Sequence, residues 1–285
     1  MKLLKLWHIG FAILVLKVVL ITYLLITVLP TVSTSDLIPG NTFYIFVIVG
    51  FVAQVIDGTL GMAYGVSCST LLLNLGIAPK VASAAVHTAE VFTTGVSGLS
   101  HRGFKNIDKQ LFFRLVFPGV IGAMAGAYLL SEVIDGHRIK PFVAAYLFIL
   151  GLVILIKGIR NRPKEHTKVK RAGLLAFVGG FLDAAGGGGW GPIVTSNIIN
   201  QGKSPKETIG TVNTTEFFVA FFSTGVFLFF VGVESWPVVL GLIIGGIVAA
   251  PIGAILAHRV NKRVLMILVG AVVMLTSSIT IYNVL

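Results

Sequence analysis

The chain has 285 residues, of which 55% are hydrophobic and only 12% are charged, and its mean hydropathy is +0.95. A soluble domain has about 25% charged residues, so this composition excludes a soluble enzyme or binding domain. The formal net charge of +11 would indicate a nucleic-acid partner in a soluble protein, but here the basic residues lie in short segments between apolar blocks, and we expect no nucleic acid. The single cysteine, Cys68, excludes a disulfide framework and a thiolate metal cluster.

Seven apolar blocks predict membrane-spanning helices, because each is long enough to cross the roughly 30 Å hydrocarbon core of a bilayer. In chain order they are Ile9–Leu29, Val81–Ser100, Leu111–Leu130, Phe142–Ile159, Thr214–Val233, Val238–Ala257 and Val264–Ile281. The first block is longer than the apolar core of a signal peptide, and we expect it to be an uncleaved span. The predicted fold class is therefore all-α, a polytopic membrane protein embedded in the lipid bilayer.

A duplication organises the chain after the first span. At an offset of 126 residues, Phe51–Glu90 aligns with Phe177–Glu216 without a gap. Most identical residues are Gly, Pro, Asn, Asp, Glu or Lys, which an apolar composition does not explain, so the chain contains a repeated unit. The matching pairs include Asp57/Asp183, Gly61/Gly187, Gly65/Gly191, Thr88/Thr214 and Glu90/Glu216.

Each unit begins with an apolar segment, Phe43–Ile56 or Ala172–Leu182, that runs into a glycine-containing break. A second short segment follows, Val66–Leu75 or Pro192–Asn200. Segments this short do not span a bilayer comfortably, so they predict re-entrant hairpins or two thin spans, and three long helices complete each unit. The predicted organisation is one integral membrane domain: 1–40 (N-terminal span and outer loop), 41–160 (first unit), 161–171 (basic cytoplasmic linker) and 172–285 (second unit).

The charges of the connecting segments predict the orientation. Arg102–Lys109, Arg160–Arg171 and His258–Arg263 are basic and predicted cytoplasmic, whereas Thr31–Gly40 and Gly232–Trp236 have no Lys or Arg and are predicted outside. This alternation requires each broken pair to cross the membrane an even number of times. We therefore expect a multi-pass protein of the cell membrane with its N-terminus in the cytoplasm, its C-terminus outside and its two units inverted. Inverted repeats with broken helices are the architecture of secondary transporters.

The glycine-rich break Asp183–Pro192 is the strongest candidate binding site. A glycine break that leads into a helix presents backbone N–H groups to a small anion. The alternative is that the glycines only let helices pack closely. The glycines concerned are Gly186, Gly187, Gly188, Gly189 and Gly191, together with Gly61 and Gly65 of the first unit.

The aspartates that precede the breaks, Asp57 and Asp183, can cap the following helix, bind a proton or anchor the unwound backbone. We favour a structural role, because a permanent negative charge would repel an anionic substrate.

A polar group on the third segment of each unit is the second candidate. It reads His87-Thr88-Ala89-Glu90 in the first unit and Asn213-Thr214-Thr215-Glu216 in the second. Residues i and i+3 share a helix face, so we expect His87, Thr88, Asn213 and Thr214 to orient a substrate. Glu90 and Glu216 are either proton acceptors or ties to the glycine breaks, and the two roles are compatible. Lys17, inside the first span, can extend its charged end towards the inner membrane surface.

Chemistry other than binding has no support in the sequence. There is no Gly-x-Ser-x-Gly and no His-Glu-x-x-His motif, and Gly61-x-x-x-Gly65 is not followed by the lysine of a phosphate-binding loop. The six histidines are scattered along the chain. We therefore expect no enzyme activity, no cofactor and no metal site.

These features resemble the sulfite exporter TauE/SafE family. The resemblance rests on the break Asp183–Pro192, the Gly-x-x-Pro-Lys turns Gly76–Lys80 and Gly202–Lys206, and the helix with Asn213–Glu216, and it covers Phe43–Leu285. It implies a permease for small sulfur-containing anions such as sulfite or organosulfonates. One departure is the first-unit break, Thr59–Gly65, which has fewer glycines than is usual in that family.

The leading interpretation is a secondary transporter of small anions, with its site between the two breaks and with coupling to protons through Glu90 or Glu216. The first alternative is a passive anion channel with the same fold. The second is a membrane component for assembly or sensing that transports nothing. The oligomeric state is left open.

Overall fold

The computed structural model describes residues 6–28, 41–103, 106–134, 136–160, 169–232, 236–256 and 261–284, and within these ranges every regular element is a helix. Six helices are long and apolar enough to cross a membrane, with candidate spans of 19 to 25 residues. The chain is therefore an all-helical, multi-pass membrane protein, as the composition predicts. The predicted outer loop, 31–40, and most of the basic linker, 161–168, lie outside the described residues.

The order of the helices along the chain repeats. Helices α4, α5 and α6 correspond to α9, α10 and α11. The first residues of each corresponding pair are 126 residues apart, to within one residue. The elements are α1 (Leu6–Val28), α2 (Asn41–Leu60), α3 (Tyr64–Asn74), α4 (Pro79–Gly103), α5 (Lys109–Tyr128), the π-helical segment η2 (Leu129–Val133), α6 (Gly136–Ile159), α7 (Ala172–Gly186), the π-helical segment η3 (Gly191–Thr195), α8 (Ser196–Asn200), α9 (Pro205–Phe230), α10 (Trp236–Leu256) and α11 (Lys262–Val284). The opposite orientation of the two units in the membrane stays a prediction.

Two predicted lengths differ from the structure. The first apolar segment was expected to be too short to span, but α2 has 20 residues, and at about 1.5 Å per residue it is as long as the hydrocarbon core is thick. Its partner α3 has 11 residues and is short, as predicted. The block Val81–Ser100 was expected to be a span, but α4 is not among the six apolar helices, because polar side chains such as His87 and Glu90 interrupt it and are buried in the protein.

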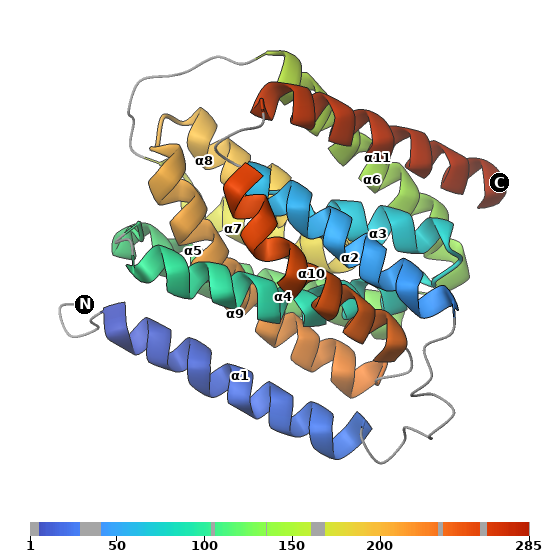
Figure 1. Ribbon diagram of the computed structural model, residues 1–285, viewed down its shortest axis with the longest axis horizontal. Helices are drawn as coiled ribbons and strands as arrows, with labels where there is room; N and C mark the ends of the chain where they lie inside the picture. Colours follow the sequence, from blue (N-terminus) through green and yellow to red (C-terminus); the bar gives the residue numbers. More distant parts are fainter. Residues whose placement is uncertain are drawn as a thin grey trace.

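The two units interlock instead of lying side by side. The most extensive helix pairs are α2 with α10, α5 with α7, α6 with α11, and α4 with α9. At the 126-residue offset, the α2–α10 pair corresponds to the α7–α5 pair, so the first helix of each unit packs on a helix of the other. Helices α6 and α11 lie together along one edge, and α1 lies along the opposite edge (Figure 1).

Helix α1 is attached to the body by apolar packing and one lysine. Its buried side chains, among them Ile9 and Ile13, pack against α4 and α9. The Lys17 side chain crosses above Gly95, whose missing Cβ leaves room for it, and donates to the carbonyl oxygen of Phe92 at 3.1 Å. The lysine therefore bonds to the backbone of α4, and its extension towards the inner membrane surface stays a prediction.

Glycines allow the interlocked pairs to meet backbone to backbone. A Cβ added at Gly122 of α5 would overlap the carbonyl oxygen of Phe177 in α7, and one at Gly180 would overlap the α5 backbone. In the corresponding α2–α10 pair, a Cβ at Gly245 would overlap the carbonyl oxygen of Val47. Small residues of this kind are what membrane helices use to approach closely, since the bilayer offers no hydrophobic drive for helix association.

A polar connection fixes the start of α5 near the start of α9. Oδ1 of Asp108 accepts hydrogen bonds from the amides of Gln110 and Leu111 at 2.9 and 3.1 Å, so Asp108 caps α5. Its Oδ2 lies 2.7 Å from Nζ of Lys203, just before α9. Burial opposes the ionisation of Asp108, but the hydrogen bonds from Lys203 and from the two amides outweigh it, and its pKa lies below the ordinary value.

Gly122→Ala should destabilise the protein, because the added methyl group has no room between α5 and α7. Overpacking of this kind costs about 1–3 kcal/mol, and thermal unfolding in detergent should show a lower midpoint. Gly225→Ala is the matched control, since nothing among the described residues lies within 4 Å of its added methyl group, and alanine is favoured over glycine inside a helix. Equal midpoints for the two variants would contradict the close α5–α7 contact.

Asp108→Ala should lower the stability by about 1 kcal/mol at neutral pH through loss of the helix cap. Because the pKa of Asp108 is lowered in the folded protein, its contribution is complete above the ordinary carboxyl pKa of about 3.9 and is lost as the pH falls through the lowered value. The unfolding midpoints of the variant and the parent protein should therefore draw closer together as the pH is lowered from 7 to 3. A difference that stays constant over this range would contradict this assignment.

Candidate functional site

The two breaks, far apart in sequence, are in direct contact. The hydroxyl of Ser69 in α3 donates to the carbonyl oxygen of Gly187. A Cβ added at Gly188 would overlap the backbone of Gly65, and one at Gly191 would lie 2.8 Å from the Met62 side chain. The structure thus brings Gly65 of the first unit against Gly187 and Gly188 of the second, whereas Gly61, which was also singled out, lies against the Ile209 side chain.

Backbone conformation explains why both helices end at the breaks. Gly187 and Gly188 have φ values of +74° and +153°, which favour glycine, and α7 ends at Gly186. In the first unit, Gly61 has φ +70° and Ala63 has φ +88°. A left-handed residue other than glycine is uncommon, so the first break keeps its turn at Ala63 despite having fewer glycines.

The two aspartates join the segments on either side of each break. Oδ1 of Asp183 accepts from the amide of Trp190 at 2.9 Å, and its main-chain carbonyl accepts from the amide of Gly188 at 2.9 Å. The carboxylate of Asp57 accepts from the backbone of Tyr64, the residue that matches Trp190 in the duplication. This geometry favours the structural role for both aspartates. It also means that the amides of Gly188 and Trp190 are already hydrogen-bonded and are not free for an anion in this conformation.

Helix α4 carries a histidine and a glutamate against the second break. Nε2 of His87 lies 3.2 Å from Oδ2 of Asp183, and both side chains are buried. Glu90 is 2% exposed, and its Oε2 has no hydrogen-bond partner among the described residues. His87, Glu90 and Asp183 each offer one atom that can bind a metal ion, and these three atoms lie within 4.8 Å of one another.

Four carboxyl groups lie close to one another around the breaks. Glu90 lies within electrostatic range of Asp57, Asp183 and the half-buried Glu216 of α9. Two lysines in membrane-spanning helices donate to main-chain carbonyls in place of these carboxylates: Lys157 to that of Pro192 at 2.8 Å, and Lys17 to that of Phe92.

The other predicted substrate-orienting residues hydrogen-bond elsewhere. The hydroxyls of Thr88 and Thr214 each donate, at 2.7 Å, to the carbonyl four residues earlier in their own helix. Asn213 donates to the hydroxyl of Ser97 at 3.0 Å and so joins α9 to α4. Of these four residues, His87 is the one whose side chain lies within hydrogen-bonding distance of a break residue in the described structure, at Asp183.

Several residues at the site escape sequence reasoning. Tyr146 of α6 packs so closely on the second break that a Cβ at Gly186 would overlap its ring and one at Gly189 would overlap its hydroxyl. That buried hydroxyl has no hydrogen-bond partner among the described residues. Its counterpart in the duplication is Val272, so the repeat gives no signal for it. Ser69 does have a similar counterpart, Thr195, which a comparison of similar residue types would detect.

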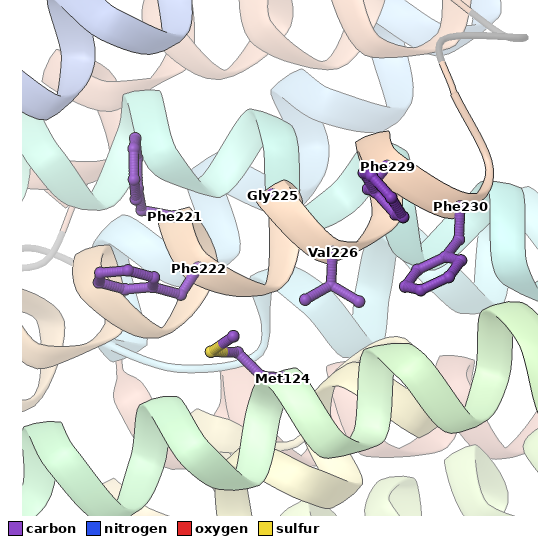
Figure 2. Close-up of a pocket in the computed structure, with 7 residues that line it drawn as sticks. All are labelled: Met124, Phe221, Phe222, Gly225, Val226, Phe229 and Phe230. Atoms are coloured by element: carbon purple, nitrogen blue, oxygen red, sulfur yellow. The ribbon is translucent and has the colours of Figure 1, made fainter.

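A hollow on the outside of the bundle is unlike this site. It has a volume of about 430 Å³ and lies between α5 and α9, and it is lined by apolar side chains (Figure 2). The lining residues are Met124, Phe221, Phe222, Gly225, Val226, Phe229 and Phe230. It offers no polar group to an anion, and it lies on helices that are candidate membrane spans.

Comparison with known proteins agrees with a transporter. The sequence profile of the family described as sulfite exporter TauE/SafE matches residues 46–279. The probable membrane transporter protein YtnM of Bacillus subtilis is 44% identical over 248 residues, which cover 84% of this chain and 82% of that protein. The probable membrane transporter protein YunE of the same organism is 21% identical over 270 residues, covering 85% of this chain and 98% of that protein.

A plant protein extends the comparison. The sulfite exporter TauE/SafE family protein 3 of Arabidopsis thaliana is 27% identical over 110 residues, which cover 39% of this chain and 22% of that protein. The family match spans most of the chain, including both breaks and the helices that flank them. The chain therefore belongs to the sulfite exporter TauE/SafE family of membrane transporters.

Proposed function

We propose that this protein is a secondary transporter of small anions and that the substrate crosses where the two breaks meet. The observation that carries the proposal is the contact of two broken helices, at Gly65 and Gly188, inside an all-helical membrane protein. Broken helices near the centre of a repeat protein form the substrate sites of many secondary transporters. Sulfite and organosulfonates are the proposed substrate class, which the family description supports for sulfite.

The interlocked units provide a means of alternating access. Because the first helix of each unit packs on a helix of the other, a movement of one unit is transmitted to both breaks. The breaks are closely packed in this conformation, with Gly188 against Gly65. Substrate entry then requires this contact to loosen, and the polar groups around it, Tyr146 and His87 among them, become exposed to the anion.

Proton coupling is proposed at Glu216. This residue lies on α9, is half-buried and is within electrostatic range of Asp57 and Asp183. An ionisable side chain inside a membrane helix is a functional candidate, because burial of its charge is costly. The proposed orientation in the cell membrane has the N-terminus in the cytoplasm and the C-terminus outside.

Gly188→Ala should abolish anion uptake into proteoliposomes, because the added methyl group overlaps the backbone of Gly65. Sulfite, sulfate and sulfoacetate are offered in turn, and accumulation against a gradient by the parent protein is the expected result. Gly225→Ala, at an open position of α9, should transport normally. Full activity of a correctly inserted Gly188→Ala variant would contradict the site, and equilibration without accumulation by the parent protein would indicate a channel.

Glu216→Gln should leave anion flux measurable but remove its response to an imposed pH gradient. Uptake is measured with and without the gradient in the same vesicles. Glu207→Gln is the matched control, because Glu207 lies on the same helix but is half-exposed and pairs with Lys203 at 3.1 Å. If both variants keep the pH response of the parent protein, Glu216 does not carry the coupled proton.

A further inference from the structure

The hydrogen bonds around His87 assign the position of its ring proton. Nδ1 lies 2.8 Å from the main-chain carbonyl oxygen of Ser83, which only accepts. The hydroxyl of Ser83 lies 3.3 Å from the same nitrogen, but its single proton goes to the carbonyl of Ala184 at 2.7 Å. Nδ1 is therefore the donor, and in the neutral ring Nε2 carries a lone pair.

That lone pair faces another acceptor. Nε2 lies 3.2 Å from Oδ2 of Asp183, and an ionised carboxylate has no hydrogen to donate. Two acceptors at this distance need a positive charge between or beside them, which is either a proton or a metal ion. Two ligands at about 2.0–2.1 Å from one Zn²⁺-like ion in tetrahedral geometry lie roughly 3.3 Å apart, close to the observed spacing.

We propose that His87, Glu90 and Asp183 bind a divalent transition-metal ion. The third group, Glu90, is buried and has one oxygen without a hydrogen-bond partner in the described structure, and its ligand atom lies within 4.8 Å of the other two. A proton between His87 and Asp183 would leave that oxygen unsatisfied, whereas a metal ion satisfies all three residues. One imidazole with two carboxylates suits ions such as Zn²⁺, Co²⁺ or Mn²⁺.

The surroundings of the three ligands match those of known metal sites. A metal-binding histidine almost always donates its other ring N–H to a carbonyl, carboxylate or water, as His87 does to Ser83. Ligating carboxylates are in turn hydrogen-bonded, as Asp183 is by the amide of Trp190. The backbone of the second break, through the amide of Trp190, therefore holds the Asp183 carboxylate in position.

The ion gives the anion something to bind. Three protein ligands leave an open position on a tetrahedral metal ion, and the positive charge offsets carboxylates that would otherwise repel an anionic substrate. This step rests on the proposed transport of an oxyanion, whose oxygen would occupy the open position. The metal site itself does not depend on it.

The second unit supplies a built-in comparison. At the 126-residue offset the corresponding residues are Asn213, Glu216 and Asp57, so an amide replaces the imidazole. The His87→Asn variant therefore has the same three residue types, Asn, Glu and Asp, at the proposed site as the second unit has at the corresponding positions. One ion per chain, and not two, is the expected stoichiometry.

The test is metal binding by the full-length protein, purified in detergent without a histidine tag and treated with a chelator. Zn²⁺, Co²⁺ and Mn²⁺ are titrated separately and followed by calorimetry, by metal analysis after gel filtration and by the visible absorption of Co²⁺. We expect one ion per chain and quenching of Trp190 fluorescence by Co²⁺, because Trp190 is bonded to Asp183. His87→Asn and Glu90→Gln should each weaken binding by at least about 10-fold.

Glu207→Gln and His8→Asn are the controls and should keep the ion, since both residues lie outside the proposed set and Glu207 pairs with Lys203. Thermal unfolding shows whether each variant is folded. If His87→Asn is not folded, Glu90→Gln, which preserves the shape of the side chain, provides the test of metal binding. No binding of any of the three ions by the parent protein, or unchanged binding by folded His87→Asn and Glu90→Gln, would overturn the proposal. A parent protein that binds the ion but transports no anion would leave the metal site and remove the proposed function.

Discussion

The close contact between the two glycine breaks is the constraint on which the rest of the structure depends. Gly188 and Gly65 meet at a distance that no side chain permits, and this contact holds only if both helices stop where they do. Asp183 and Asp57 secure those ends by bonding across each break to the first residues of the next segment. In a bilayer, unwound backbone must find such partners within the protein, because water is absent. The glycine breaks and the two aspartates therefore act together to stabilise this contact.

Burial of charge is the second constraint. Asp57, Glu90, Asp183 and Glu216 interact electrostatically within a body of apolar helices. Ionised carboxylates in such surroundings must be paired, protonated or bound to a cation. Two lysines of the membrane helices bond to carbonyls, so among the described residues it is His87 that reaches one of these four carboxylates. An anion carried past these groups, as proposed, would meet less repulsion with an added positive charge, either a proton or a metal ion.

The sequence predicts the class, the repeat and the place of the breaks because these depend on local chemistry: long apolar blocks, and Gly, Pro and Asp at matched positions. It does not predict the length of α2, because the helix continues past the apolar run, through Asp57 and Thr59, to Leu60. It also cannot show which residues meet across helices. Tyr146 joins the second break from a helix whose counterpart has Val272, and His87 acquires Asp183 from the other unit. Such contacts depend on how the helices pack against one another, and the spacing of residue types along the chain does not predict that packing.

The differences between the two units are as informative as their likeness. Duplication predicts equivalent sites in the two units. The residues that correspond to His87 and Asp183 are, however, Asn213 and Asp57, and the side-chain amide of Asn213 donates to Ser97 of α4. The covering helix α1 likewise reaches one α4 carbonyl through Lys17 and the gap at Gly95, where the matching position in α9 is Phe221. An anion that passes between the breaks, as proposed, would therefore meet different polar groups at each of them.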